Sequence, residues 1–162
     1  PTLSPSMDIQ ISSNFERLLW EASGRRADDV TDLLARFRAE GRVTVPEPWV
    51  TAIRAEMTGF RLDDEGTLAE MARLHHELGR VVDPHTAVGL AAARACRRDP
   101  AVPMVTLATA DPAKFPDAVE RAVGTRPPLP PFLAELFSRP EHVHPMANDL
   151  DALVGVIRGL PA

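Results

Sequence analysis

The chain has 162 residues, of which 44% are hydrophobic, and this is enough for one domain with a buried core. Its formal net charge of -5 argues against a surface that binds nucleic acid or anionic membranes, and no apolar run approaches the roughly 20 residues of a membrane span. The single cysteine excludes an internal disulfide framework and favours a cytoplasmic protein. Because the chain opens on Pro1 without a leader-like sequence, we expect it to be a segment of a longer protein.

The first half of the chain predicts helices with clear start and stop signals. Ser13 and Glu16 have the spacing of a capping box, and Gly24 ends the helix that follows them. Gly41 ends a second helix, and Pro48 lies near the start of a third. The predicted helices span 12–23, 27–40, 46–57 and 63–79, with a short strand at 60–62.

The second half of the chain combines helices with an expected buried strand. The stretch "DPHTAVGLAAARACRR" predicts a helix with Asp83 at its N-cap and Pro84 in its first turn. The apolar, β-branched stretch 102–110 predicts a buried strand, and the next helix, 113–124, must hold Pro116 in its first turn. Short helices are expected near 131–138 and 148–159, and "HVHPM" at 142–146 is expected to form a small edge strand.

This order of helix, strand, turn and helix is typical of an α/β protein whose helices pack on a mostly parallel sheet. In open α/β sheets, ligands bind beyond the carboxyl ends of the strands. The turn after residue 110 is therefore the first place to look for a site. Thr109 lies where the predicted strand ends, so its hydroxyl either meets a ligand or caps the next turn.

Lys114 is the only lysine of the chain, which makes it a candidate reactive amine or a solvent-facing side chain. His85 in the first turn of its helix either faces a ligand or forms a local hydrogen bond. The histidine pairs 75–76 and 142–144 lack a well-spaced third ligand, so we expect no metal site. No glycine-rich phosphate loop and no G-x-S-x-G motif is present.

Stretches of the sequence, in order, resemble blocks of the threonine synthase family, in its longer bacterial and fungal branch. The stretch "SPSMDIQISSNFERLLWE" is similar to the family's "MD(I/V)…SNxER" block. The stretch "DPHTAVG" is similar to "(D/E)PH(T/A)AV", and "LATADPAKFPDAV" is similar to "TAHPAKF". The order and spacing of the blocks agree with the family, and the resemblance covers nearly the whole chain.

The resemblance implies an enzyme that converts O-phosphohomoserine and water to threonine and phosphate with pyridoxal 5'-phosphate. It also implies a fold-type II, tryptophan-synthase-β-like architecture, of which residues 1–162 would form the C-terminal segment of the catalytic domain. The rest of the chain, upstream, would carry the lysine that binds the cofactor covalently. No catalytic residue is therefore expected in this segment, and Lys114 matches a different lysine of the family.

The resemblance also assigns site residues. Thr109 matches the threonine that approaches the ring nitrogen of the cofactor. Asn14 and Arg17 match the "SNxER" block and would lie on the substrate side or brace the lobe interface, where an arginine can grip phosphate with two hydrogen bonds. The remaining cleft-lining candidates are His85, Asp111 and Lys114.

Asp111 stands where the family has histidine, and it would either favour protonation of nearby groups or cap the next helix. This departure keeps two alternatives open. One is a related fold-type II lyase or a threonine-synthase-like protein with altered activity. The other is a non-catalytic structural domain, because this segment holds no covalent cofactor lysine.

Overall fold

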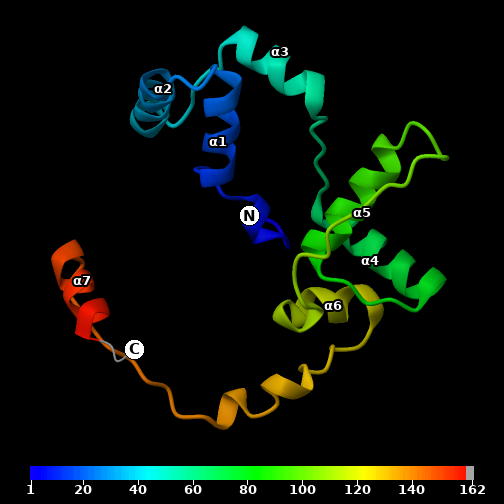
Figure 1. Ribbon diagram of the computed structural model, residues 1–162. Coiled ribbons are helices and arrows are strands. Elements are labelled where there is room, and N and C mark those ends of the chain that lie inside the picture. The colour runs from blue at the N-terminus through cyan, green and yellow to red at the C-terminus, as the bar shows by residue number, and fades with distance from the viewer. Residues whose placement is uncertain (160–162) are drawn as a thin grey trace. The chain divides into compact units, whose positions relative to one another are not determined.

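The computed structural model describes residues 1–159 of the chain, and its regular elements in this range are helical. The chain divides into two compact units, Pro1–Pro128 and Leu129–Ala162 (Figure 1). The helices of the first unit are α1 (Ser13–Ala22), α2 (Ala27–Glu40), α3 (Glu47–Glu56), α4 (Asp64–Leu78), α5 (Pro84–Cys96) and α6 (Pro116–Val123), with 3-10 turns η1 (Pro5–Met7) and η2 (Pro112–Lys114). The second unit holds η3 (Pro131–Leu133), η4 (Leu136–Ser138) and α7 (Leu150–Gly159).

Most of the predicted helices are confirmed, with three corrections: 131–138 forms the 3-10 turns η3 and η4, α6 begins only at Pro116, and the cap of α1 differs. The N-cap is Ser12, whose hydroxyl accepts a hydrogen bond from the backbone N–H of Phe15 at 3.5 Å. Ser13 is the first helical residue, so the predicted capping box with Glu16 is wrong. Glu16 lies one position past N3, where a side chain is not placed to reach back to the N-cap.

A first small core joins α1, α2 and α3. Leu19 of α1, Val30 and Leu33 of α2 and Trp49 of α3 are each at most 5% exposed and pack together. Burial of each such side chain is worth about 1.5–3 kcal/mol relative to an exposed one. Hydrophobic packing therefore sets the arrangement of these helices, more than the weak intrinsic propensity of short helices does.

A second core joins α4, α5 and α6. Met71 of α4, Ala87 of α5 and Val119 of α6 are almost fully buried, and the small side chain of Ala87 lets the helices approach closely. Beside this core the buried carboxylate of Glu70 forms ion pairs with Arg73, at 2.8 Å, and with Arg94 of α5. The hydrogen bonds that Arg73 donates to Glu70 raise the pKa of the Arg73 guanidinium. The ion pair between Glu70 and Arg94 ties α4 to α5.

The predicted strands are not found in residues 1–159. The segments 60–62, 102–110 and 142–146 are irregular, and so the expected parallel sheet does not form within the described chain. The segment 102–110 was predicted to be buried, yet Val105 and Leu107 are 80% and 75% exposed. The physical reason is that a strand is stabilised only by a partner strand, and none of the described segments offers one.

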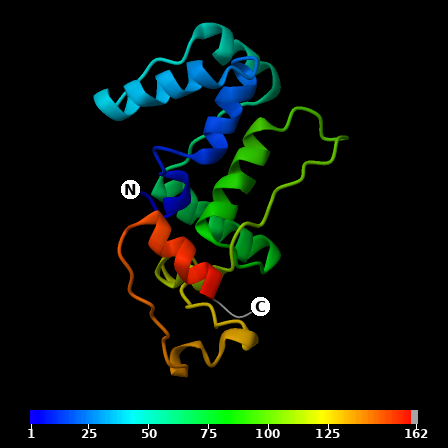
Figure 2. The same ribbon diagram turned by 60° about the vertical axis from the view of Figure 1, so that its left-hand side comes forward.

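The segment that follows α5 turns back and runs beside this helix in the opposite direction, as two views agree (Figures 1 and 2). Close approach is possible because Gly89 of α5 has no side chain. A Cβ placed there would lie 3.1 Å from Cγ2 of Thr106. The segment thereby reaches the N-terminus of α5 at Thr109.

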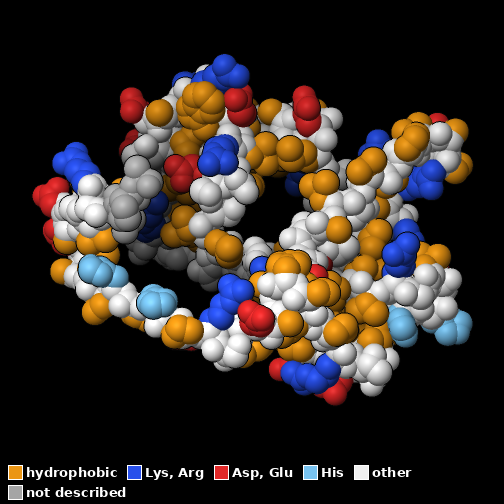
Figure 3. All heavy atoms as spheres, turned by 60° about the horizontal axis from the view of Figure 1, so that its bottom comes forward, with side chains coloured by type: hydrophobic (Ala, Val, Ile, Leu, Met, Phe, Trp, Pro, Cys, Tyr) orange, Lys and Arg blue, Asp and Glu red, His pale blue; other side chains and the backbone are white. Residues whose placement is uncertain are grey.

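The second unit has little core of its own within residues 129–159. No side chain in that range is buried, and Phe132 and Phe137 are 80% and 84% exposed. Hydrophobic side chains also reach the surface over much of the remaining molecule (Figure 3).

Candidate functional site

A buried carboxylate organises the N-terminus of α5. Asp83 is fully buried and caps the helix, because its Oδ1 accepts hydrogen bonds from the backbone N–H groups of His85 at 2.9 Å and Thr86 at 3.4 Å. Its Oδ2 accepts the hydroxyl proton of Thr86. Within residues 1–159 no lysine or arginine pairs with Asp83, so the helix N-terminus and these donors are what stabilise its charge.

His85 joins this carboxylate to the N-terminal segment. Its Nδ1 lies 3.0 Å from Oδ1 of Asp83, and its Nε2 accepts a hydrogen bond from the backbone N–H of Ser6 at 3.2 Å. We therefore assign the neutral tautomer with the proton on Nδ1, which satisfies both contacts. The ring is 6% exposed and lies 4.8 Å from the ring of Phe115 between centroids. Both ring nitrogens of His85 are thus bonded to groups of this chain, and the ring packs against Phe115.

The N-terminal segment, residues 2–8, is held in a closed turn by hydrogen bonds between Thr2 and Asp8. The backbone N–H of Thr2 donates to Asp8 at 2.6 Å, and the hydroxyl of Thr2 donates to the same carboxylate at 2.9 Å. These two donors hold the pKa of Asp8 below its ordinary value, so the closure is present at neutral pH and is lost on acidification. The backbone N–H of Leu3 donates to Asp64 of α4 at 2.8 Å, which anchors the segment to the second core.

Thr86 carries the same network to Thr109. The backbone N–H of Thr109 donates to the hydroxyl oxygen of Thr86 at 3.1 Å. Thr86 is 5% exposed, whereas Thr109 lies at the surface. The backbone of Thr109 is consequently fixed on the buried end of α5 while the residue remains accessible to a ligand.

Asp111 and Lys114 lie on η2, directly after this point. The side chain of Asp111 accepts a hydrogen bond from the backbone N–H of Ala113 at 2.8 Å and so caps the turn. Lys114 is exposed, and no carboxylate within residues 1–159 forms an ion pair with its ammonium group. Of the two roles considered for Asp111, the capping role is the one that this structure contains.

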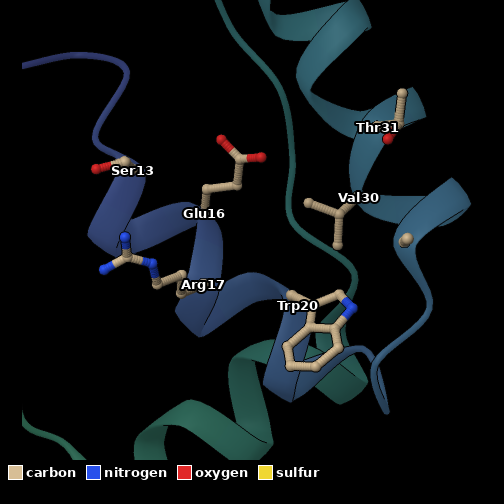
Figure 4. A pocket seen from close by; sticks show the side chains of 7 residues that line it. Ser13, Glu16, Arg17, Trp20, Val30 and Thr31 are labelled. Carbon is tan, nitrogen blue, oxygen red and sulfur yellow. The ribbon is translucent and has the colours of Figure 1, made fainter.

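Asn14 and Arg17 form a separate pair on α1. Nη1 of Arg17 donates to Oδ1 of Asn14 at 2.9 Å, and both residues are exposed. Arg17 borders a groove of about 300 Å³ that also includes Glu16, Trp20 and Val30. In Figure 4 the guanidinium of Arg17 extends away from α2, whereas Glu16 points towards it. Within residues 1–159 no carboxylate pairs with Arg17, which leaves most of its N–H donors available to an anion.

The structure therefore brings together His85, Thr109 and the η2 turn around Asp83, and it keeps the Asn14–Arg17 pair apart from them. No hydrogen bond or ion pair in the described range links the two groups. Sequence reasoning found Asp83 as a cap but missed its contact with Thr86 and the bond from Thr86 to Thr109. The one signal was a polar Thr86 in the first turn of a mostly apolar helix, and this does not tell which distant residue it meets.

No group of histidine, cysteine or acidic side chains within residues 1–159 is arranged to bind a metal ion. None of the helices in the described part of the chain has the length and apolarity that crossing a membrane requires.

Comparisons with known proteins agree on one family. Residues 86–157 match the family model for the C-terminal part of threonine synthase. Threonine synthase from Pseudomonas aeruginosa is 48% identical over 151 residues, covering 93% of this chain and 32% of the relative. The PLP-bound threonine synthase from Brucella melitensis is a similar solved structure, with 44% identity, a TM-score of 0.79, and coverage of 98% of this chain and 34% of that one.

Yeast threonine synthase is also similar in structure, with 28% identity and a TM-score of 0.75 over 98% of this chain and 36% of that one. The chain thus spans about a third of the length of the relatives that it matches. Its similarity to them extends over nearly all of its own length and includes the stretches that contain Asp83 and Thr109. The chain belongs to the threonine synthase family and corresponds to its C-terminal portion.

Proposed function

We propose that this chain is part of an enzyme that converts O-phosphohomoserine and water to threonine and phosphate with pyridoxal 5'-phosphate. The observation that carries the proposal is the 44% identity to a PLP-bound threonine synthase over 98% of this chain. Because the chain matches only about a third of such proteins, we propose that it acts within a longer polypeptide as the C-terminal segment of the catalytic domain. Its single cysteine keeps the cytoplasm as the expected location.

The residues of the Asp83 network fit one wall of a cofactor site. A neutral hydroxyl suits the ring nitrogen, because it donates or accepts without adding a charge. Thr109 offers such a hydroxyl at the surface, on a backbone that Thr86 holds at 3.1 Å. When bound, pyridoxal phosphate supplies an electron sink for the substrate carbons. The contribution of this chain is to bind and orient the ring and to exclude water from one side of it.

Lys114 is not proposed as the covalent anchor of the cofactor, although it is the only lysine of the chain. It is exposed, and nothing around it provides the burial or cationic neighbour that would activate an amine. We assign the covalent anchor to the part of the enzyme outside this chain. Lys114, Asp111 and His85 remain proposed as residues that line or brace the cleft.

We further propose that the segment 102–110 becomes a strand of a mostly parallel sheet in the complete fold-type II enzyme. The proposal is supported by its β-branched composition and by the exposure of Val105 and Leu107. Such a segment gains a hydrogen-bonding partner and burial at the same time when the neighbouring strands are present. Thr109 would then lie at the carboxyl end of a strand, where ligands bind in α/β folds.

Replacement of Thr109 by valine in the complete enzyme should weaken cofactor affinity by about 2- to 10-fold. Thr109→Val preserves the shape of the side chain and removes one hydrogen bond, which is worth about 0.5–1.5 kcal/mol. The dissociation constant of pyridoxal phosphate, measured from the visible absorbance of the bound form, provides the test. An unchanged dissociation constant and unchanged turnover would remove Thr109 from the site.

Arg17→Lys should raise the KM for O-phosphohomoserine by about tenfold with little change in thermal stability. Lysine keeps the positive charge but cannot form the paired hydrogen bonds of a guanidinium with phosphate. Steady-state kinetics and an unfolding curve on the same preparation separate this role from a structural one. A KM equal to that of the parent enzyme would contradict a role of Arg17 in substrate binding. Its role would then be limited to the hydrogen bond with Asn14 on the surface of α1.

An experiment on the complete protein distinguishes the proposed function from its two alternatives. With pyridoxal phosphate and O-phosphohomoserine, we expect the visible band of the bound cofactor and release of threonine and phosphate in equal amounts. A bound cofactor without threonine formation would favour a related fold-type II lyase, for which the Asp111 substitution is the specific observation. Absence of the band would favour a non-catalytic domain and would refute the proposed function.

A further inference from the structure

The bonds around Asp83 exceed what capping a helix requires. A helix cap needs one oxygen that accepts from the first backbone N–H groups, and Oδ1 of Asp83 already does this. Its Oδ2 instead accepts the hydroxyl proton of Thr86, and the oxygen of that hydroxyl accepts the N–H of Thr109. Both Asp83 and Thr86 are buried, so water does not substitute for these partners.

The bond at Thr109 has no reinforcement nearby. Within the described chain it is the only hydrogen bond made by any group of residues 103–110. The rest of that segment rests on side-chain contact, such as that of Thr106 with Gly89, and Val105 and Leu107 face away from the protein. Among the bonds made within the described chain, the position of the Thr109 N–H therefore depends on the direction in which the Thr86 hydroxyl points.

Asp83 fixes that direction. An ionised carboxylate only accepts hydrogen bonds, so the single hydroxyl proton of Thr86 is committed to Oδ2. The lone pairs of the hydroxyl oxygen are then left for the N–H of Thr109. An asparagine in place of Asp83 could turn its NH₂ group towards Thr86 and would remove this preference.

From these contacts we infer that Asp83 and Thr86 are positioning residues for Thr109. Asp83 orients the hydroxyl of Thr86, and Thr86 holds the backbone of Thr109, so that the Thr109 hydroxyl is presented to the ring nitrogen of the cofactor. The inference rests on the proposed role of Thr109 in the cofactor site. It assigns to the first turn of α5 a part in setting that site without any contact of its own with the cofactor.

The test compares Thr86→Val and Thr86→Ser with a matched control, Thr67→Val, all in the complete enzyme. Thr67 has the same residue type, is equally buried in the first turns of a helix, and donates its hydroxyl proton to the backbone oxygen of Asp63 at 2.8 Å. No hydrogen bond in the described range links it to the segment 102–110. Thr67→Val thus reports what loss of a buried hydroxyl does by itself.

The first readout is hydrogen exchange of peptides that cover 105–111 in the cofactor-free protein. Thr86→Val should accelerate exchange there at least several-fold, because the Thr109 N–H loses its acceptor, while Thr86→Ser and Thr67→Val should exchange like the parent protein. The second readout is cofactor affinity, which should weaken about 2- to 10-fold in Thr86→Val and recover in Thr86→Ser. Unchanged exchange in Thr86→Val would overturn the inference whatever the cofactor does.

Including Thr109→Val in the same series separates the inference from the proposed function. If Thr109→Val weakens cofactor binding and Thr86→Val does not, the positioning role is refuted and the cofactor site stands. If Thr109→Val binds the cofactor like the parent enzyme, the proposed role of Thr109 fails, and the inference fails with it. An equal loss of affinity in Thr67→Val and Thr86→Val would also overturn it, because the effect would then be general destabilisation.

Discussion

Purified by itself and supplied with pyridoxal phosphate, this 162-residue chain should release no phosphate from O-phosphohomoserine above the background rate. The proposed chemistry needs a lysine that binds the cofactor covalently, and the one lysine present, Lys114, is exposed and matches another position of the family. The chain also spans only about a third of its relatives, so the remaining walls of the cleft are absent. Preorganised electrostatic stabilisation cannot act on a cofactor that stays in water.

The isolated chain should also self-associate. The side chains of Val105, Leu107 and Phe137 are at least 75% exposed, and a segment such as 102–110 with unpaired backbone groups is a template for pairing with another chain. Size-exclusion chromatography and a phosphate-release assay on one preparation give both results. Turnover by the isolated chain that disappears in Lys114→Ala would place the reactive amine in this chain and refute the assignment of the anchor elsewhere.

Asp83→Ala should destabilise the complete enzyme by about 3 kcal/mol or more, the largest effect that we expect from a single substitution in this chain. The change removes a helix cap, worth about 1 kcal/mol, and leaves the hydroxyl proton of Thr86 and the Nδ1–H of His85 without their acceptor. Each buried polar group that loses its partner costs a further ~1–3 kcal/mol. The measurement is the shift of the unfolding midpoint in denaturant.

Asp63→Ala provides the matched control for this prediction. Asp63 is the N-cap of α4 and accepts the backbone N–H of Gly66 at 2.8 Å, but it is exposed and makes no second side-chain bond within residues 1–159. Its removal should cost about 1 kcal/mol, the usual value for a cap. Equal losses for Asp63→Ala and Asp83→Ala would mean that Asp83 acts as a cap alone.

Local signals predicted the helices well, because caps and stop residues act over a few positions. Asp83 at the N-cap of α5 and Gly41 after α2 have the predicted roles. The cap of α1 was assigned to Ser13 instead of Ser12, because the two serines offer the same capping hydroxyl. The strand at 102–110 was predicted from composition, but strand formation depends on a partner that a local pattern does not supply.

The candidate site was predictable only in part for the same reason. Thr109 and His85 were singled out from their positions in the chain and from the family resemblance. The structure adds that Thr86 connects them through Asp83, across a sequence separation of 23 residues between Thr86 and Thr109. Such a long-range bond produces no periodic pattern in the sequence. Only the folded chain shows that Thr86 and Thr109 belong to one hydrogen-bond network.

The proposed contact between Thr109 and the ring nitrogen of the cofactor is measured by the nitrogen-15 resonance of pyridoxal phosphate labelled at that nitrogen. In the complete enzyme, we expect Thr109→Val to move this resonance because the ring nitrogen loses its hydrogen-bond partner. Thr106→Val, which removes a hydroxyl from the same segment beside Gly89, should leave the resonance in place. A resonance that is identical in the parent enzyme and in Thr109→Val would show that Thr109 does not bond the ring nitrogen.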